Sequence, residues 1–293
     1  MTKTTDSESR ALDLVLITGL SGSGKSVALA VLEDAGYYCV DNFPGQLLNG
    51  LVDTLVNAGH TRAALTMDAR SGSDMAHFAA HVESLRERGV KCKMLYLDAK
   101  DDTLLKRFSE TRRRHPLCDG RLTLTECIAQ DRALLADAAA LANHIDTSEL
   151  SPNALRTWVK DFVAVPRDGL ILLFESFGFK YGIPLDADLV FDVRSLPNPY
   201  YDPLLRALDG RDAEVIAFMR DTPEAQRMLE DIRKFVTTWL PSYLRDNRSY
   251  LTVAIGCTGG RHRSVYFVEA LAQACRGATP VLTRHRGLSQ RGA

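Results

Sequence analysis

Residues 19–26 read GLSGSGKS, a glycine-rich segment with the spacing G-x-x-x-x-G-K-[ST]. The apolar residues 13–18 (DLVLIT) precede this segment, and residues 27–34 follow it with helical spacing up to Gly36. A buried strand, a tight turn and a helix are therefore expected in direct succession. Glycines in such a turn let backbone amides converge at the helix N-terminus, where they stabilise phosphate oxygens. The sequence predicts a phosphate-binding loop formed by Gly19, Leu20, Ser21, Gly22, Ser23, Gly24, Lys25 and Ser26.

Three residues are candidates for the chemistry at this loop. Lys25 is placed to reach the β and γ phosphates of a nucleotide, and Ser26 to hold Mg²⁺. Asp68 and Asp98 each follow an apolar run, where a second Mg²⁺ ligand belongs, although either could simply begin a loop or cap a helix. Asp68 is favoured because Arg70 follows it and could also face a phosphate. Lys25, Ser26 and Asp68 are thus the expected catalytic residues, and Ser26 and Asp68 the expected metal ligands.

Strand and helix patterns alternate along the whole chain, which predicts an α/β fold with parallel sheets covered on both faces. The expected strands are residues 13–18, 37–40, 63–67, 93–97, 144–146, 170–174, 187–193 and 251–256. The expected helices are residues 27–34, 47–56, 75–88, 102–112, 124–142, 153–164, 223–239 and 264–275. The turn-rich residues 165–169 (VPRDG) suggest two domains, residues 1–165 and residues 166–293.

Composition limits the class of protein. The 293 residues have 36 basic and 37 acidic side chains and are 45% hydrophobic, which excludes a disordered chain. No apolar run approaches the ~20 residues of a membrane span, and the polar residues 1–10 lack a secretory signal. The six cysteines include no CxxC pair and are too dispersed for a disulfide scaffold or a zinc ribbon. A reducing cytoplasm, with no membrane partner, is the expected location.

A second glycine-containing loop follows the apolar residues 251–256. Residues 257–264 read CTGGRHRS and open another predicted helix, so glycine amides, arginines and a histidine meet at a helix N-terminus. The segment also fits the Cys-x5-Arg-Ser spacing of cysteine-dependent phosphatases, in which a thiolate attacks phosphate. Gly256 stands where those enzymes usually have histidine. A noncovalent anion site, a phosphatase loop and a structural turn all remain open here.

Two basic segments are also candidates for binding anions. Residues 112–116 (RRRHP) separate two predicted helices and fit either a lid that closes over phosphates or a solvated charge cluster. Residues 270–293 contain no acidic residue, which indicates an anionic partner. The arginines of that segment are Arg276, Arg284, Arg286 and Arg291.

Several longer strings closely resemble the RapZ/YvcJ family of P-loop nucleotide-binding proteins. These strings are GLSGSGKSVAL, YYCVDNFP, RRRHPL, FESFGFKYGIP, FDVRSLPNPYYD and NRSYLTVAIGCTGGRHRSVY, together with the terminal RHR. The resemblance implies a kinase-like N-terminal domain that binds and weakly hydrolyses ATP and GTP. It places ATP on residues 19–26, and it places GTP on Asp68, Ala69, Arg70 and Ser71, where Ala69 is a mild departure from the family pattern.

The same resemblance implies a C-terminal domain like a sugar-phosphate-binding kinase domain, which binds an amino-sugar phosphate and a small regulatory RNA. The expected metabolite residues, including those that the loop sequence suggested, are Lys180, Asp192, Arg194, Asn247, Cys257, Thr258, Gly259, Gly260, His262 and Arg263. The expected RNA residues are Arg276, Arg284, Arg286 and Arg291. Implied partners are an endoribonuclease of the RNase E type and further copies of the chain. The expected function is therefore a regulatory adapter, with a small-metabolite kinase or a Cys257 phosphatase as alternatives.

Overall fold

The computed structural model describes residues 12–68, 78–164, 170–245, 250–277 and 279–288. The chain forms two compact units, of which the first comprises Met1–Ser148 and Leu155–Lys160 and the second Glu149–Ala154 and Asp161–Ala293. Helix α7 (Pro152–Ala164) contributes residues to both units. The division therefore falls at this helix, whereas the sequence suggested a boundary just after it.

The first unit is built on a five-stranded parallel sheet with the strand order β2-β3-β1-β4-β5. Strand β1 lies between β3 and β4, with Ile17 opposite Thr66 on one side and Leu95 on the other. The residue after the C-terminal end of β1 thus emerges at the middle of the sheet edge, where α/β proteins bind ligands. The strands are β1 (Asp13–Gly19), β2 (Tyr38–Val40), β3 (Arg62–Thr66), β4 (Lys91–Asp98) and β5 (Asn143–Asp146).

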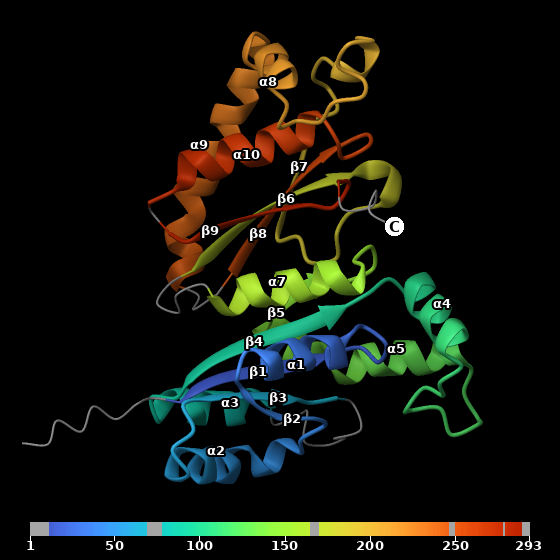
Figure 1. Ribbon diagram of the computed structural model, residues 1–293, viewed down its shortest axis with the longest axis vertical. Helices are drawn as coiled ribbons and strands as arrows, with labels where there is room; N and C mark the ends of the chain where they lie inside the picture. The colour runs from blue at the N-terminus through green and yellow to red at the C-terminus, as the bar shows by residue number, and fades with distance from the viewer. Residues whose placement is uncertain (1–11, 69–77, 165–169, 246–249, 278, 289–293) are drawn as a thin grey trace, which may run out of the picture. The chain divides into compact units, whose positions relative to one another are not determined.

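Helices of the first unit cover this sheet (Figure 1). Buried aliphatic and aromatic side chains fill the space between the helices and the sheet. The helices are α1 (Lys25–Asp34), α2 (Leu48–Asn57), α3 (Phe78–Glu87), α4 (Asp101–Thr111), α5 (Leu124–Leu134) and α6 (Ala136–Leu141). The predicted helix 124–142 is two helices, because the backbone leaves helical values at Leu135 (φ −98°, ψ 3°). A capping box of Thr123 and Glu126 fixes the start of α5.

The second unit contains a four-stranded parallel sheet with the order β7-β8-β6-β9. Its strands are β6 (Ile171–Gly178), β7 (Leu189–Asp192), β8 (Tyr250–Cys257) and β9 (Val281–His285). Its helices are α8 (Ala213–Arg220), α9 (Pro223–Arg245) and α10 (Arg263–Cys275). Helix α10 packs along β6, β8 and β9, with α9 beside it (Figure 1). The prediction of an α/β protein with parallel sheets is confirmed, although β9 and α8 were not predicted.

One feature of the fold has no counterpart in the sequence analysis. Cys118, in the loop between α4 and α5, forms a disulfide with Cys127 in the first turns of α5. Cys39, Cys92, Cys257 and Cys275 are free. A single pair of this kind is no scaffold, and the spacing of nine residues gave no indication of it.

No helix in the described ranges has both the length and the apolar character that crossing a bilayer requires.

Candidate functional site

The glycine-rich loop has the strand-turn-helix context that its sequence predicted. Strand β1 ends at Gly19 and helix α1 begins at Lys25. Gly19 has φ +138°, and a Cβ atom there would lie 2.2 Å from the carbonyl oxygen of Leu97. No residue with a side chain fits this position without displacing the backbone of β4. Gly19 therefore lets the turn start directly against the neighbouring strand.

The loop presents donors suited to a phosphate group. The amides of Lys25 and Ser26 stand in the first turn of α1, where backbone N–H groups have no intrahelical acceptor. The Lys25 ammonium lies across the turn and donates to the carbonyl oxygens of Gly19 at 2.6 Å and Leu20 at 3.1 Å. The hydroxyl-bearing residue Ser26 is exposed at the helix start. Amides, helix dipole and ammonium together form an anion site.

Three residues that the sequence analysis missed hold the loop in shape. The buried carboxylate of Asp131 in α5 accepts a hydrogen bond from the Ser21 amide at 2.7 Å. Arg107 donates to the carbonyl oxygen of Gly22 at 3.1 Å. The Thr147 hydroxyl donates to the carbonyl oxygen of Ser23 at 2.9 Å. All three lie far along the chain from the loop, so no local sequence signal could reveal them.

The two candidate metal ligands of the sequence analysis differ in their surroundings. Asp98 accepts two hydrogen bonds from the Arg132 guanidinium, at 2.8 and 3.0 Å. Burial raises the pKa of Asp98, although Arg132 opposes the shift. Asp68 follows β3 and is buried at the strand end. The Ser26 hydroxyl and the Asp68 carboxylate are oxygen ligands of the kind that Mg²⁺ prefers, so the residues present fit this ion. Ala69, Arg70 and Ser71 lie outside the described residues.

The basic segment between α4 and α5 divides into two parts. Arg112, Arg113 and Arg114 are exposed, as both a closing lid and a solvated cluster would require. His115 is buried instead, with its Nε2 atom 3.3 Å from the Asp131 carboxylate. Burial lowers the pKa of His115, so the ring is neutral near pH 7. His115 is therefore not part of a solvated charge cluster.

The second loop, between β8 and α10, is also a strand-turn-helix junction. Strand β8 ends at Cys257 and α10 begins at Arg263. Gly260 has φ +70°, and a Cβ atom there would lie 2.7 Å from the amide nitrogen of Gly178. The loop is thereby pressed against the end of β6, which brings the segment after β6 close to it. The Lys180 amide accordingly donates to the carbonyl oxygen of Thr258 at 3.3 Å.

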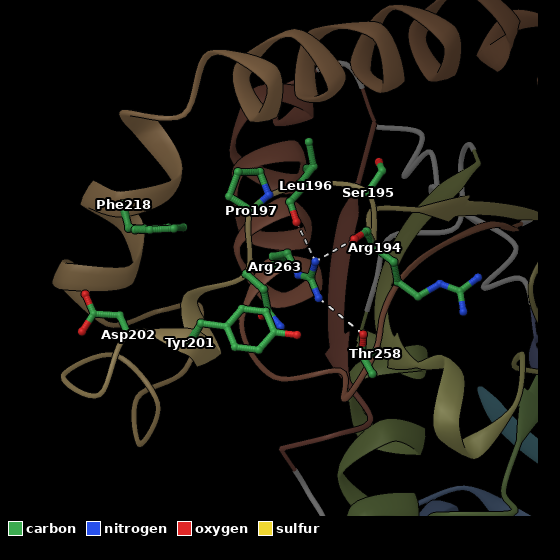
Figure 2. Close-up of a pocket in the computed structure, with 10 residues that line it drawn as sticks. Arg194, Ser195, Leu196, Pro197, Tyr201, Asp202, Phe218, Thr258 and Arg263 are labelled. Atoms are coloured by element: carbon green, nitrogen blue, oxygen red, sulfur yellow. Dashed lines mark hydrogen bonds between the residues drawn. The ribbon is translucent and has the colours of Figure 1, made fainter.

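An open cavity of about 660 Å³ lies beside this loop (Figure 2). Arg263 lies at its centre and donates to the carbonyl oxygens of Arg194 at 2.9 Å and Leu196 at 2.7 Å. A longer contact of 3.4 Å joins its guanidinium to the Thr258 hydroxyl. The cavity is lined by Arg194, Ser195, Leu196, Pro197, Asn198, Tyr201, Asp202, Phe218, Thr258 and Arg263.

Arg263 is only 3% exposed, yet among the described residues no carboxylate pairs with it and its Nε atom has no hydrogen-bond acceptor. The charge of Asp192 acts on Arg263 without direct contact. A buried cation that no carboxylate contacts favours an anion in the cavity. Arg194 forms a two-point ion pair with Asp192, and its guanidinium lies 3.9 Å from the centre of the Phe179 ring. Hydrogen bonds from Arg194 lower the pKa of Asp192. Asp192 and Arg194 thus gather near Arg263 as predicted.

Other predicted members of this site do not line the cavity. The buried Cys257 thiol lies 3.2 Å from the Ser264 hydroxyl and accepts from the Gly260 amide at 3.2 Å. Burial would raise the pKa of Cys257, but the hydrogen bonds outweigh it and the pKa is lowered. The buried His262 ring bonds the carbonyl oxygen of Leu205 at 3.1 Å. Cys257 and His262 hold the loop rather than face the cavity. Gly259 is half-buried in the loop, and Asn247 lies outside the described residues.

The arginines near the C-terminus are not the exposed surface that their sequence suggested. Arg284 is 8% exposed, and its guanidinium lies 3.3 Å from Glu175 and 3.2 Å from Asp186. Arg286 is 3% exposed and shares the same Glu175 oxygen at 3.3 Å. Buried carboxylates thus already neutralise both side chains, so the expectation that these two arginines form an exposed basic surface is wrong. RNA binding by them stays a prediction. Arg276 is exposed at the end of α10, and Arg291 lies outside the described residues.

A phosphate-binding loop after the central strand of a parallel β2-β3-β1-β4-β5 sheet defines the first unit as a P-loop domain. Comparison with known families adds a more specific assignment. The RapZ-like N-terminal domain matches residues 12–166, and the RapZ C-terminal domain matches residues 170–289. The chain therefore belongs to the RapZ family, as the sequence strings indicated.

The relatives below match nearly the whole chain, whereas the solved structure matches about half of it. A nucleotide-binding protein of Azoarcus sp. (strain BH72) is 59% identical over 281 residues, covering 96% of each chain. A nucleotide-binding protein of Thiobacillus denitrificans (strain ATCC 25259 / T1) is 57% identical over 278 residues, covering 95% of this chain and all of the relative. A solved shikimate kinase from Bacteroides thetaiotaomicron is 16% identical with a TM-score of 0.36, over 52% of this chain and 97% of that chain.

Proposed function

We propose that this protein is a nucleotide-binding regulatory adapter whose second unit binds a phosphorylated amino sugar and a small regulatory RNA. The RNA is presented to an endoribonuclease of the RNase E type, and the chain acts as a homo-oligomer in the cytoplasm. The observation that carries the proposal is Arg263, a buried cation without a carboxylate partner among the described residues, on an open cavity of about 660 Å³. Such a cation is suited to a ligand that brings its own negative charge.

The nucleotide half of the proposal rests on the glycine-rich loop. ATP or GTP would place its phosphates on the amides of Lys25 and Ser26 and on the Lys25 ammonium. Ser26 and Asp68 would hold Mg²⁺, which neutralises charge on the phosphates when bound. We expect hydrolysis to be slow and the nucleotide to serve regulation.

The metabolite half rests on the chemistry that lines the cavity. Arg263 and Thr258 supply donors for a phosphate group. Asn198 and Asp202 add a carboxamide and a carboxylate, which suit sugar hydroxyls and a protonated amine. The exposed Tyr201 ring adds an apolar surface of the kind on which sugars stack. This mixture of arginine, short polar groups and an aromatic ring favours a small phosphorylated sugar over a purely apolar ligand.

Burial in ion pairs argues against Arg284 and Arg286 as the main RNA contacts. We retain Arg276 as a candidate because it is exposed, and Arg291 as a candidate from sequence alone. Binding through such arginines would weaken steeply as salt rises, because counterions are released from the RNA.

The proposal is tested by calorimetric titration of the full chain with a hexosamine phosphate. We expect Arg263→Met and Thr258→Val to weaken binding, and Arg233→Met to leave it unchanged, because Arg233 pairs with Glu230 on the exposed face of α9. Filter binding of a labelled small-RNA fraction, with and without the sugar phosphate, then tests whether the two ligands communicate. Absence of both sugar-phosphate and RNA binding in the wild type would refute the adapter.

One observation favours the alternative of a cysteine-dependent phosphatase. Cys257, Arg263 and Ser264 keep the order of the phosphatase loop, and hydrogen bonds lower the pKa of the Cys257 thiol. The thiol is, however, only 3% exposed and lies under the loop rather than in the cavity. Turnover of phosphate esters by the wild type that Cys257→Ser abolishes would favour the phosphatase. Fast ATP consumption with one phosphate acceptor, lost in Lys25→Ala, would instead favour a metabolite kinase.

A further inference from the structure

A cluster of sulfur and nitrogen atoms between α4 and α5 is used by none of the functions discussed so far. One ring nitrogen of His115 and the sulfur atoms of Cys118 and Cys127 lie within 4.8 Å of one another. His115 and Cys127 are buried, and Cys118 is half-buried. The cluster therefore has a protected interior and one side that faces solvent.

The two sulfurs are joined as a disulfide in the structure, but the same pair can exist in a second chemical state. Reduction by a low-molecular-weight thiol yields two cysteine thiols and the disulfide of the reductant, so electrons and protons balance. The Cα atoms of Cys118 and Cys127 are 5.8 Å apart. Two thiolates on one tetrahedral zinc ion, with Zn–S bonds of ~2.3 Å, lie roughly 3.8 Å apart. Side-chain rotation alone can open the sulfurs to that distance.

Buried polar atoms beside the sulfurs provide an independent indication of a ligand. His115 Nε2 lies 3.3 Å from Asp131 Oδ2, in a geometry that makes no hydrogen bond. Asp131 Oδ1 is also buried and has no hydrogen-bond partner among the described residues. Metal-bound histidines usually present their second ring nitrogen to a carboxylate, which fixes the ring. A rotation of the His115 ring would satisfy that arrangement and turn the other nitrogen, Nδ1, toward the sulfurs. The metal would then replace the hydrogen bond that Nδ1 accepts from the Leu117 amide at 3.2 Å.

We propose that His115, Cys118 and Cys127 bind a thiophilic divalent metal ion, with Zn²⁺ as the best match, when the two cysteines are reduced. Asp131 is the positioning residue that holds the His115 ring. A mixed set of one imidazole and two thiolates is typical of zinc and unsuited to Mg²⁺, which prefers oxygen. Binding releases the two thiol protons to solvent, and water takes the fourth position on the side of Cys118.

The site adjoins the phosphate loop without being part of it. Asp131 Oδ2 accepts the Ser21 amide at 2.7 Å, so one carboxylate contacts both the loop and His115. This metal would therefore be distinct from the Mg²⁺ that Ser26 and Asp68 are proposed to hold, both in ligand type and in position along the chain.

The test is a titration of the reduced, nucleotide-free full chain with Co²⁺, followed by Zn²⁺. We expect one equivalent of Co²⁺ to give a thiolate-to-metal charge-transfer band, and Zn²⁺ to displace it. Cys118→Ser and Cys127→Ser should lose the band, whereas Cys39→Ser, in β2 of the same unit, should keep it. Asp131→Asn should weaken binding about 10- to 100-fold and alter the visible Co²⁺ spectrum.

A second measurement needs no variant and so does not depend on variant folding. Zn²⁺ should protect Cys118 and Cys127 of the reduced wild type from alkylation, as read by peptide mass spectrometry, while Cys39 remains equally reactive. A reduced wild type that shows no charge-transfer band and no protection would overturn the proposal. Persistence of the disulfide in excess thiol, or an unchanged band in both cysteine variants, would overturn it as well.

Discussion

Replacing Glu175 with glutamine tests whether the buried arginines hold the second unit together. Glu175 is fully buried, and one of its carboxylate oxygens lies 3.3 Å from both Arg284 and Arg286. Glu175→Gln keeps the size and shape of the side chain but removes its negative charge. Asp186 then remains beside two buried guanidinium groups.

The expected loss of stability follows from these distances. At 3.3 Å and an effective dielectric constant of about 20, each contact of Glu175 is worth about 5 kcal/mol of Coulomb attraction. The desolvation of the carboxylate, which the variant no longer requires, offsets part of the two contacts. Removing one partner from a buried ion pair typically costs about 3–5 kcal/mol, so we expect the free energy of unfolding to fall by that amount.

The assay is urea unfolding of the second unit followed by tryptophan fluorescence. The chain has two tryptophans, so a Trp158→Phe background leaves Trp239 in α9 as the reporter. Glu269→Gln is the matched control, because Glu269 is 43% exposed and pairs with His285, which predicts a loss of at most about 1 kcal/mol. If Glu175→Gln costs no more than Glu269→Gln, the buried arginines do not stabilise the fold and the reasoning fails.

Three further predictions concern the first unit. Gly19→Ala should abolish nucleotide binding in a nucleotide titration, because the new Cβ would lie 2.2 Å from the Leu97 carbonyl oxygen. The control is Gly50→Ala in α2, which should bind nucleotide normally because a Cβ there meets nothing within 4 Å. Thr147→Val should lower nucleotide affinity at least roughly 5- to 10-fold, since each hydrogen bond lost costs about 1 kcal/mol. The Thr147 hydroxyl accepts from Arg107 and lies within hydrogen-bond distance of the carbonyl oxygens of Ser23 and Asp98. Unchanged affinity would show that Thr147 does not support the loop. Burial lowers the pKa of Lys93 from 10.5 to about 8, so the unfolded chain binds more protons between these values and stability rises with pH across that window. Lys93→Met should accordingly stabilise the protein at pH 7 by at most about 3 kcal/mol, the equivalent of this pKa shift. The advantage should shrink between pH 8 and pH 10.5 in urea unfolding, and an advantage independent of pH would show that the ammonium is not responsible.

The hydrophobic pattern of the sequence alone was sufficient to predict most strands of the two sheets. Each expected strand corresponds to an observed one with ends that differ by a few residues, because strands buried on both faces read as continuous apolar runs. Strand β9 escaped because its sequence, VLTRH, ends in two residues that look solvent-exposed. The break between α5 and α6 escaped because Leu135 is a good helix former and only the three-dimensional context takes it out of the helix.

The residues of the candidate sites also differ in whether the sequence could predict them. Lys25, Ser26 and Arg263 could be predicted because their roles depend on neighbours within one strand-turn-helix segment. Asp131 and Thr147 could not, because each reaches its loop from more than 100 residues away. Long-range partners are chosen by packing, and packing leaves no periodic trace in a single sequence.

The sequence by itself determined where phosphate-binding turns form, since glycine freedom, helix dipoles and adjacent cationic side chains are local properties of the chain. It also determined the alternation of strands and helices that requires parallel sheets. Only the tertiary structure decided which charges face solvent. Arg284 and Arg286 are basic in any sequence reading, but the sheet places Glu175 and Asp186 against them and buries all four. Arg263 is buried beside a cavity without such a partner among the described residues, and that difference in neighbours separates a structural arginine from a candidate binding one.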